Sequence, residues 1–241
     1  MADAKIRLFV EQPLGQGQTV ALAQDQAHYL FGVMRRTVGD NILTFNGKDG
    51  EWLAEVVESG KRKGSLTVLE KTREQVSLPD LWLLFAPLKK ARTDFLVEKA
   101  VELGASRLQP VLTDFTNSER VRADRMRAHA IEATEQSNGL NVPDICEPMK
   151  LERLLADWDS TRQLVFCDEG TAGQSAGQFA PHEGPAALLI GPEGGFSDAE
   201  RKRLRDLHFS STISLGPRIL RAETAAVAAL TLWQTSRGDW R

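Results

Sequence analysis

Cysteine, tyrosine and histidine are scarce in this chain of 241 residues, which contains two cysteines, one tyrosine and four histidines. Cys146 and Cys167 do not form a Cys-x-x-Cys pair, and no paired histidine accompanies them. The expected state is therefore two buried, reduced thiols rather than a metal or redox site. The histidines are scattered, and no cluster of His, Cys and carboxylate residues has ligand spacing, so we expect no metal.

Long apolar runs and an excess of positive charge are also missing. No stretch approaches the roughly 18 consecutive apolar residues of a membrane span. The first ten residues lack the apolar core of a secretion signal, so we expect a cytoplasmic protein. The net charge of −3 argues against a protein that coats nucleic acid nonspecifically. Local basic runs at 61–63 and 89–92 leave RNA recognition open, although such runs are more often solvated surface.

The sequence pattern of the first part of the chain is typical of β-strands. Short runs such as "IRLFV", "NILTF" and "EWLAEVV" are rich in branched and aromatic residues, and Asn46-Gly47 is a strong turn signal between two of them. One short helix, "DQAHYLFGVMRR", interrupts these runs and is predicted to end at Arg35 and Arg36. Several short strands at this spacing predict a small barrel or sandwich over residues 1–73.

After a connector near residue 75, the sequence pattern changes to apolar strands that alternate with helices. Strands are predicted at 81–87, 107–112, 163–168, 186–191 and 211–216. Helices are predicted at 93–103, 122–137, 150–156, 198–207 and 222–236. Thr93 is the expected N-cap of the first helix, and Gly104 is placed to end it. Runs that are apolar throughout and alternate with helices predict an α/β domain with a parallel sheet covered on both faces, over residues 77–241.

Glycine-rich turns follow two of these strands. "LLIGPEGGFSDAE" (188–200) places three glycines and a proline between a strand and a helix, and Ser197 with Glu200 forms a capping box. Ligands of parallel α/β sheets bind beyond the carboxyl ends of the strands. The pattern matches neither a dinucleotide fingerprint nor a Walker loop. It fits either a binding loop or simply a tight turn.

A second turn, in "ISLGPRILRAETAAVAAL", favours the binding loop. It places Arg218, Arg221 and Glu223 beside a Gly-Pro turn at the end of another strand. Arginine is a permanent positive group for phosphate or carboxylate. The alanine-rich helix that follows suits core packing or an oligomer interface equally.

Together, "LLIGPEGGFSDAE" and "LGPRILRAETAAVAAL" closely resemble the signature of the RsmE family. These are SPOUT-class methyltransferases that act on N3 of a uridine in 16S ribosomal RNA of the small subunit. "IRLFV", "HYLFGVMR" (28–35) and "EKAVELGASRLQPV" (98–111) are similar to further family elements, so the resemblance covers nearly the whole chain. One departure is Gly139 in "EQSNG", where the family usually has an arginine, and this puts the transfer of site residues in that loop in doubt.

The resemblance implies a PUA-like, RNA-binding barrel followed by a SPOUT domain with a deep trefoil knot, and a homodimer. It also implies that S-adenosyl-L-methionine is held by the backbone of 190–195 and 215–221, where glycine avoids a collision with the cofactor. The implied cofactor residues are Ile190, Gly191, Pro192, Gly194, Gly195, Leu215, Gly216, Ile219 and Leu220.

For the reaction implied by the family, we expect Arg221 to provide the positive group near the target base or its phosphate. Glu223 or Glu193 is the candidate proton acceptor. The candidate RNA contacts are Arg7, Arg35 and Arg36 in the first domain and Lys89 and Lys99 in the second. Three alternatives remain open: a non-catalytic RNA-binding assembly protein, an enzyme with another nucleotide-like cofactor, and a methyltransferase of this fold class that modifies tRNA ribose or guanine.

Overall fold

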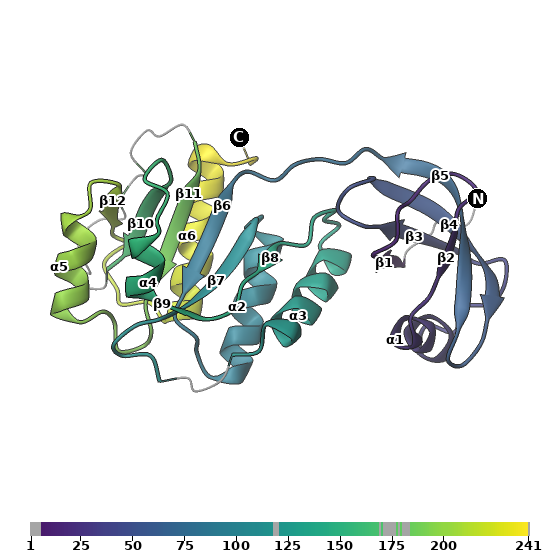
Figure 1. Ribbon diagram of the computed structural model, residues 1–241, viewed down its shortest axis with the longest axis horizontal. Helices are drawn as coiled ribbons and strands as arrows, with labels where there is room; N and C mark the ends of the chain where they lie inside the picture. The colour runs from purple at the N-terminus through teal and green to yellow at the C-terminus, as the bar shows by residue number, and fades with distance from the viewer. Residues whose placement is uncertain are drawn as a thin grey trace. The chain divides into compact units, whose positions relative to one another are not determined.

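The computed structural model describes residues 6–117, 121–168, 170, 177, 179 and 184–240, which fall into two compact units (Figure 1). The N-terminal unit comprises Met1–Ser77 and Thr134–Asn141, and the C-terminal unit comprises Leu78–Ala133 and Val142–Arg241. The sequence had placed 134–141 in the second domain. Among the described residues, no helix has both the length and the apolar character that crossing a membrane requires.

Five strands form the sheet of the N-terminal unit, in the order β1-β3-β4-β5-β2. They are β1 (Arg7–Phe9), β2 (Thr19–Ala21), β3 (Asn41–Phe45), β4 (Glu51–Ser59) and β5 (Gly64–Arg73). The pair β1–β3 is parallel and the others are antiparallel. The predicted Asn46-Gly47 turn joins β3 to β4. The Asn46 side chain accepts hydrogen bonds from the backbone of Lys48 and Asp49, and Gly47 has a φ of 78°.

The predicted helix at 25–36 is wrong in type. The structure has a single turn of α-helix, α1 (Gln24–Ala27), followed by a π-helix, η1 (His28–Val33). The N–H of Met34 bonds to the carbonyl of Tyr29, the i to i+5 spacing of a π-helix, and Arg35 then takes a left-handed φ of 54°. Periodicity alone does not separate these helix types over so short a run.

Arg7 explains why 134–141 belongs to the N-terminal unit. Its side chain is 8% exposed and its Nε donates to Glu51 at 2.8 Å. Its other nitrogens donate to the carbonyls of Thr134, Glu135 and Gly139. Every donor group is therefore engaged inside the unit, and the prediction that Arg7 contacts RNA is corrected to a structural role. Gly139, the departure from the family pattern, supplies one of these carbonyls.

The C-terminal unit has a sheet of seven strands in which every pairing is parallel, as predicted. The order is β12-β10-β11-β6-β7-β8, and β9 also pairs with β7. The strands are β6 (Leu81–Phe85), β7 (Arg107–Leu112), β8 (Asp144–Ile145), β9 (Met149–Lys150), β10 (Gln163–Cys167), β11 (Ala186–Ile190) and β12 (Ser210–Ile213). All five residues of the central strand β11 are buried, which is why its sequence is apolar throughout.

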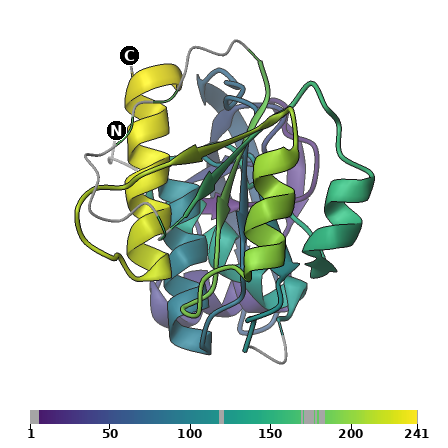
Figure 2. The same cartoon turned by 90° about the vertical axis from the view of Figure 1, so that its left-hand side faces the viewer.

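Helices cover both faces of this sheet, as predicted (Figures 1 and 2). They are α2 (Lys90–Glu102), α3 (Ala123–Gln136), α4 (Leu151–Ala156), α5 (Asp198–Asp206) and α6 (Ala222–Arg237). Leu188 and Ile190 of β11 share a core with α2, α3 and α6. Ala187 and Leu189, which point to the other face, pack with Leu151 of α4 and Leu204 of α5.

Helix α2 begins three residues earlier than predicted, so Thr93 is not its N-cap. Lys89 occupies that position, and the Thr93 hydroxyl bonds back to the buried backbone of Leu88. The helix ends at Glu102 with Leu103 as its C-cap, and Gly104 follows the cap with a φ of 74°, in the terminating position predicted for it. On α6, one face of Ala225, Ala226 and Leu230 is buried in the core, so core packing accounts for part of its apolar character.

Candidate functional site

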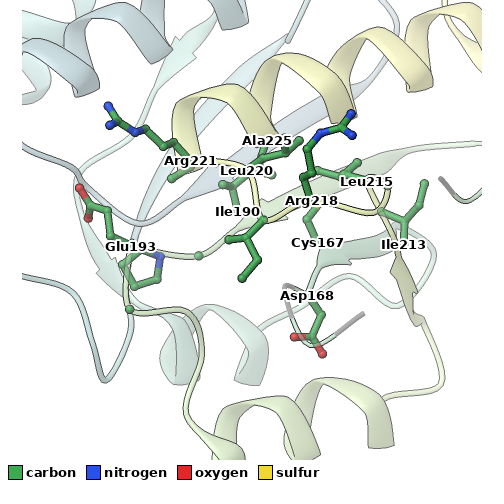
Figure 3. Close-up of a pocket in the computed structure, with 16 residues that line it drawn as sticks. Cys167, Asp168, Ile190, Glu193, Ile213, Leu215, Arg218, Leu220, Arg221 and Ala225 are labelled. Carbon is green, nitrogen blue, oxygen red and sulfur yellow. The ribbon is translucent and has the colours of Figure 1, made fainter. Parts of the chain in front are cut away.

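A cavity of about 340 Å³ opens where β10, β11 and β12 end, three neighbouring strands of the C-terminal sheet. The turn after β11, the segment after β12 and the start of α6 enclose it (Figure 3). The residues that line it are Cys167, Asp168, Ile190, Gly191, Pro192, Glu193, Gly194, Ile213, Leu215, Gly216, Arg218, Ile219, Leu220, Arg221, Ala222 and Ala225. Both glycine-rich turns found in the sequence therefore meet at one site.

The turn after β11 is held by its own hydrogen bonds. The N–H of Gly195 bonds to the carbonyl of Pro192 at 2.9 Å. The predicted capping box is present: the Ser197 hydroxyl accepts from the Glu200 N–H, and the Glu200 carboxylate accepts from the Ser197 N–H. The start of α5 is thus fixed directly behind the turn.

The protein itself requires glycine at several of these positions. A Cβ on Gly191 would lie 3.0 Å from the Phe196 ring, and one on Gly194 would lie 3.2 Å from the Cβ of Phe115. Gly195 and Gly216 have φ values of 69° and 109°, where L-residues are strained. Close packing and backbone conformation therefore account for these glycines without a ligand. The expectation that they avoid a cofactor stays a prediction.

Three charged residues from three different elements meet beside the cavity. Arg92, on the first turn of α2, lies with its Nη1 3.1 Å from Glu193 Oε1 and its Nε 3.6 Å from Glu223 Oε1. The Glu193 side chain is 40% exposed, whereas that of Glu223 is 13% exposed. The Oε2 atom of Glu223 is buried and has no hydrogen-bond partner among the described residues. The sequence analysis missed Arg92, which stands in the basic run 89–92.

Two arginines on the segment after β12 are exposed at the cavity. Arg218 and Arg221 lie on opposite sides of it in Figure 3, with Arg221 on the same side as Glu193. Neither makes an ion pair with any residue in the described ranges. Arg221 is also the N-cap residue of α6. The arrangement leaves two permanent positive charges available to an anionic ligand.

Asp168 is a second residue of the site that the sequence analysis missed. It follows the last residue of β10, and its side chain is fully buried at the cavity. Its carboxylate accepts from Arg201 Nε at 3.1 Å and from Arg205 Nη2 at 2.6 Å, both on α5, and from the Gly170 N–H. The strand-end rule, applied to β10 as it was to β11, would have found it.

Cys167 also lines the cavity, at the end of β10. Burial raises the pKa of its thiol to about 12, so the group is neutral near pH 7. A neutral, buried thiol is neither a nucleophile nor a metal ligand. Within the described ranges, no group of three or more His, Cys, Asp or Glu residues is placed to hold a metal ion.

The predicted cofactor residues all line the cavity except Gly195, which lies in the turn behind it. Of the predicted catalytic residues, Arg221 and Glu193 line the cavity, whereas Glu223 does not line it and shares the ion-pair partner Arg92 with Glu193. The structure thus brings the predicted set together on one side of the C-terminal unit.

The remaining candidate RNA contacts differ in how exposed their side chains are and in whether other residues of the chain already engage their charge. Arg35 and Lys89 are exposed, and Arg36 is half-buried. Lys99 lies 2.6 Å from Glu102 and over the ring of Phe95, so its charge is partly engaged within α2. Arg35 and Lys89 are therefore the better placed candidates, each within its own unit.

Comparison with known families matches both units. A family described as "RNA methyltransferase domain" matches residues 75–234, and one described as "RNA methyltransferase PUA domain" matches residues 22–69. The latter lies within the five-stranded N-terminal unit and identifies its sheet as PUA-like.

Individual proteins similar to this chain match over nearly all of its length. The ribosomal RNA small subunit methyltransferase E of Bacillus subtilis is 31% identical, over 97% of this chain and 99% of the relative. The protein of the same name from Rickettsia conorii is 29% identical over 93% of each chain. A crystal structure of ribosomal RNA small subunit methyltransferase E from Neisseria gonorrhoeae bound to S-adenosyl methionine superposes with a TM-score of 0.88. It is 28% identical and covers 98% of this chain and 99% of that one.

Proposed function

Because the chain belongs to the ribosomal RNA small subunit methyltransferase E family, we propose that it methylates N3 of a uridine in 16S ribosomal RNA with S-adenosyl-L-methionine as the methyl donor. The observation that carries the proposal is the meeting of the two family motifs at one cavity. Residues 190–194 and 215–221 enclose a space at the strand ends, and Arg221 and Glu193 stand at its edge.

The cavity fits such a cofactor. Its volume of about 340 Å³ lies in the range of roughly 300–1,000 Å³ typical of ligand pockets. Apolar side chains of Ile190, Leu215 and Leu220 suit a flat base, and the backbone of the two turns offers N–H and C=O groups to its polar edges. The space beside Gly216 is open, because a Cβ built there meets no atom within 4 Å. Gly195 does not line the cavity and donates a hydrogen bond within the turn, to the carbonyl of Pro192.

When bound, the cofactor supplies an activated methyl group on a sulfonium sulfur. The chain's residues must then place the uridine and remove its N3 proton, since protonated N3 is a poor nucleophile. Arg221 stabilises the negative charge that develops on the base as the proton leaves. Glu193 and Glu223 are both candidate proton acceptors: Glu193 lines the cavity with its side chain 40% exposed, whereas the Oε2 atom of Glu223 is buried and has no hydrogen-bond partner among the described residues.

The N-terminal unit supplies an RNA surface beside the π-helix. The ring of Phe31 packs against Gly64, where a Cβ would lie 2.4 Å from the ring, so the turn from β4 to β5 is held next to η1. This turn carries exposed Lys61 and Arg62, and exposed Arg35 follows η1. Exposed positive side chains on these two neighbouring segments suit the phosphate backbone of RNA.

Two finer features belong to the same proposal. The chain end that forms α6 is threaded through a deep trefoil knot, and two copies of the chain form the working enzyme. Both are properties that the family resemblance implies. Size-exclusion chromatography with light scattering tests the second, and a monomer that is fully active would reject it.

Methyl transfer from labelled cofactor to small ribosomal subunits, followed by nucleoside digestion, tests the proposed function. Label should appear on N3 of uridine. Label on ribose or guanine would show that the target is wrong, and no label together with no cofactor heat in calorimetry would favour a non-catalytic RNA-binding protein. Binding of ATP or NAD in competition with S-adenosylhomocysteine would indicate a different cofactor.

Arg221→Ala should lower kcat/KM by about 10²–10³-fold, the usual effect of removing one group that stabilises transition-state charge. Its melting temperature should stay near that of the wild type, because the side chain is exposed. Arg203→Ala on α5, whose exposed guanidinium pairs only with exposed Glu152 of α4 among the described residues, is the matched control and should keep full activity.

A further inference from the structure

We propose that Arg92 is a positioning residue that occupies Glu193 and Glu223 and thereby keeps Arg221 free for the RNA. The inference rests on the proposed function, because it concerns the same site. It assigns a role to a residue that neither glycine-rich motif contains.

The geometry places Arg92 between two carboxylates from distant parts of the chain. Glu193 stands in the turn after β11, and Glu223 stands on the first turn of α6. Arg92 reaches the first at 3.1 Å and the second at 3.6 Å from two different nitrogens of one guanidinium. A guanidinium suits this position because its nitrogens lie in a rigid fork, whereas a lysine has one charged atom.

The ion pairs of Arg92 matter because of the other charges near the cavity. Glu193 and Arg221 line the cavity, and Arg92 and Glu223 are joined to Glu193 by the ion pairs of Arg92. Arg92 holds both carboxylates, and Arg221 has no ion pair among the described residues although it lies on the same side as Glu193 in Figure 3. Without Arg92, the attraction between opposite charges would draw Arg221 onto Glu193 or Glu223.

The same contact orients Glu223. Arg92 lies beside its Oε1 atom, and Oε2 is buried with no hydrogen-bond partner in the part of the chain that the structure describes. A carboxylate held through one oxygen keeps the other in a fixed direction. Arg92 therefore acts through Glu223 and Arg221 and need not touch the RNA itself.

A double-mutant cycle tests the proposal, with kcat and KM for the RNA measured for each variant. Arg92→Ala should lower kcat/KM for the RNA by about 10-fold or more, while calorimetry shows cofactor affinity within about threefold of wild type. Arg221→Ala added to Arg92→Ala should then cost much less than it does in the wild type, since Arg221 is already bound to a glutamate. Full additivity of the two losses would overturn the proposal.

Removal of the competing carboxylate gives the second arm. Glu193→Gln introduced into Arg92→Ala should recover at least part of the loss, because it removes one anion that captures Arg221. Arg92→Lys should keep an intermediate activity, because it retains the charge and loses the fork. If Glu193→Gln makes Arg92→Ala worse, or if Arg92→Lys is as defective as Arg92→Ala, the proposed role is rejected.

Two controls separate this inference from its alternatives. The melting temperature of Arg92→Ala should fall only modestly, because the pair with exposed Glu193 contributes little stability and only the longer contact with the less exposed Glu223 adds to the loss. Should it fall sharply, Arg92→Lys and Glu193→Gln still decide the question. RNA affinity in the absence of cofactor, measured over the same cycle, gives a readout that does not need turnover. If the RNA affinities of the variants are non-additive but the wild type transfers no methyl group, the proposed function is rejected. The proposed role of Arg92 in keeping Arg221 free then still holds.

Discussion

Asp168 provides a sharp test of how the cavity wall is held. Its carboxylate is fully buried, whereas the side chains of its partners Arg201 and Arg205 are 23% and 53% exposed. Removing the buried charge leaves two arginines that water can reach. Removing the arginines leaves a buried carboxylate without its two cationic partners. The second change should therefore destabilise the unit more than the first.

The magnitudes follow from the contacts. Hydrogen bonds to charged groups contribute roughly 1.5–3 kcal/mol each, and Asp168→Asn keeps one acceptor oxygen, so it should cost about 2 kcal/mol. Arg201→Ala with Arg205→Ala should cost about 3–5 kcal/mol, the usual penalty for breaking a buried ion pair. Adding Asp168→Asn to that double variant should restore stability by about 1 kcal/mol or more, because the buried charge is gone.

Urea unfolding followed by tryptophan fluorescence measures these differences. In a Trp52→Phe background the four remaining tryptophans, Trp82, Trp158, Trp233 and Trp240, all belong to the C-terminal unit, so the signal reports that unit alone. If Asp168→Asn proves more destabilising than the double arginine variant, or if it further destabilises that variant, the reasoning from burial is refuted.

Three further predictions concern pH, RNA and the thiols. The Arg125 guanidinium holds the pKa of Asp94 below its usual value, so the pair stabilises the native state above about pH 4 and the effect is lost as pH falls through the lowered pKa. Asp94→Asn should therefore lower the free energy of unfolding by about 1 kcal/mol at pH 7 and by progressively less below pH 4, as measured by urea titration; an equal loss at pH 2 would contradict this. Replacing Lys61 and Arg62 by alanine should reduce the slope of log affinity against log salt by about 1.4 for single-stranded RNA, and an unchanged slope would exclude this turn from the RNA surface. With its pKa raised to about 12, Cys167 should react with iodoacetamide at pH 8 about 10³-fold more slowly than an ordinary thiol, and rapid labelling of the folded protein at this position would contradict its burial.

Local sequence patterns predicted most of the strands and helices of the C-terminal unit. Strand β7 has the predicted ends, and the other predicted strands differ by a few residues; β6 and β11 were found because strands buried in a parallel sheet are apolar throughout. The capping box at Ser197 and the end of α2 just before Gly104 depend on neighbours within four residues, so the sequence states them directly. The rule that ligands bind at strand ends located the cavity.

Long-range contacts decided what the sequence could not. Arg7 was predicted to contact RNA because it is basic. Its buried side chain instead donates hydrogen bonds to carbonyls of residues more than 120 positions away in the sequence. Arg92 and Asp168 acquire their importance from Glu193, Glu223 and the arginines of α5, which only folding brings within reach.

By itself, the sequence determined the parallel sheet, the two glycine-rich turns and the family, since each depends on residue type and short spacing. The tertiary structure alone decided which charges are buried, which are paired and which are left facing the cavity. The physical reason is that burial and pairing of a charge depend on the atoms around it, and most of those atoms come from distant parts of the chain.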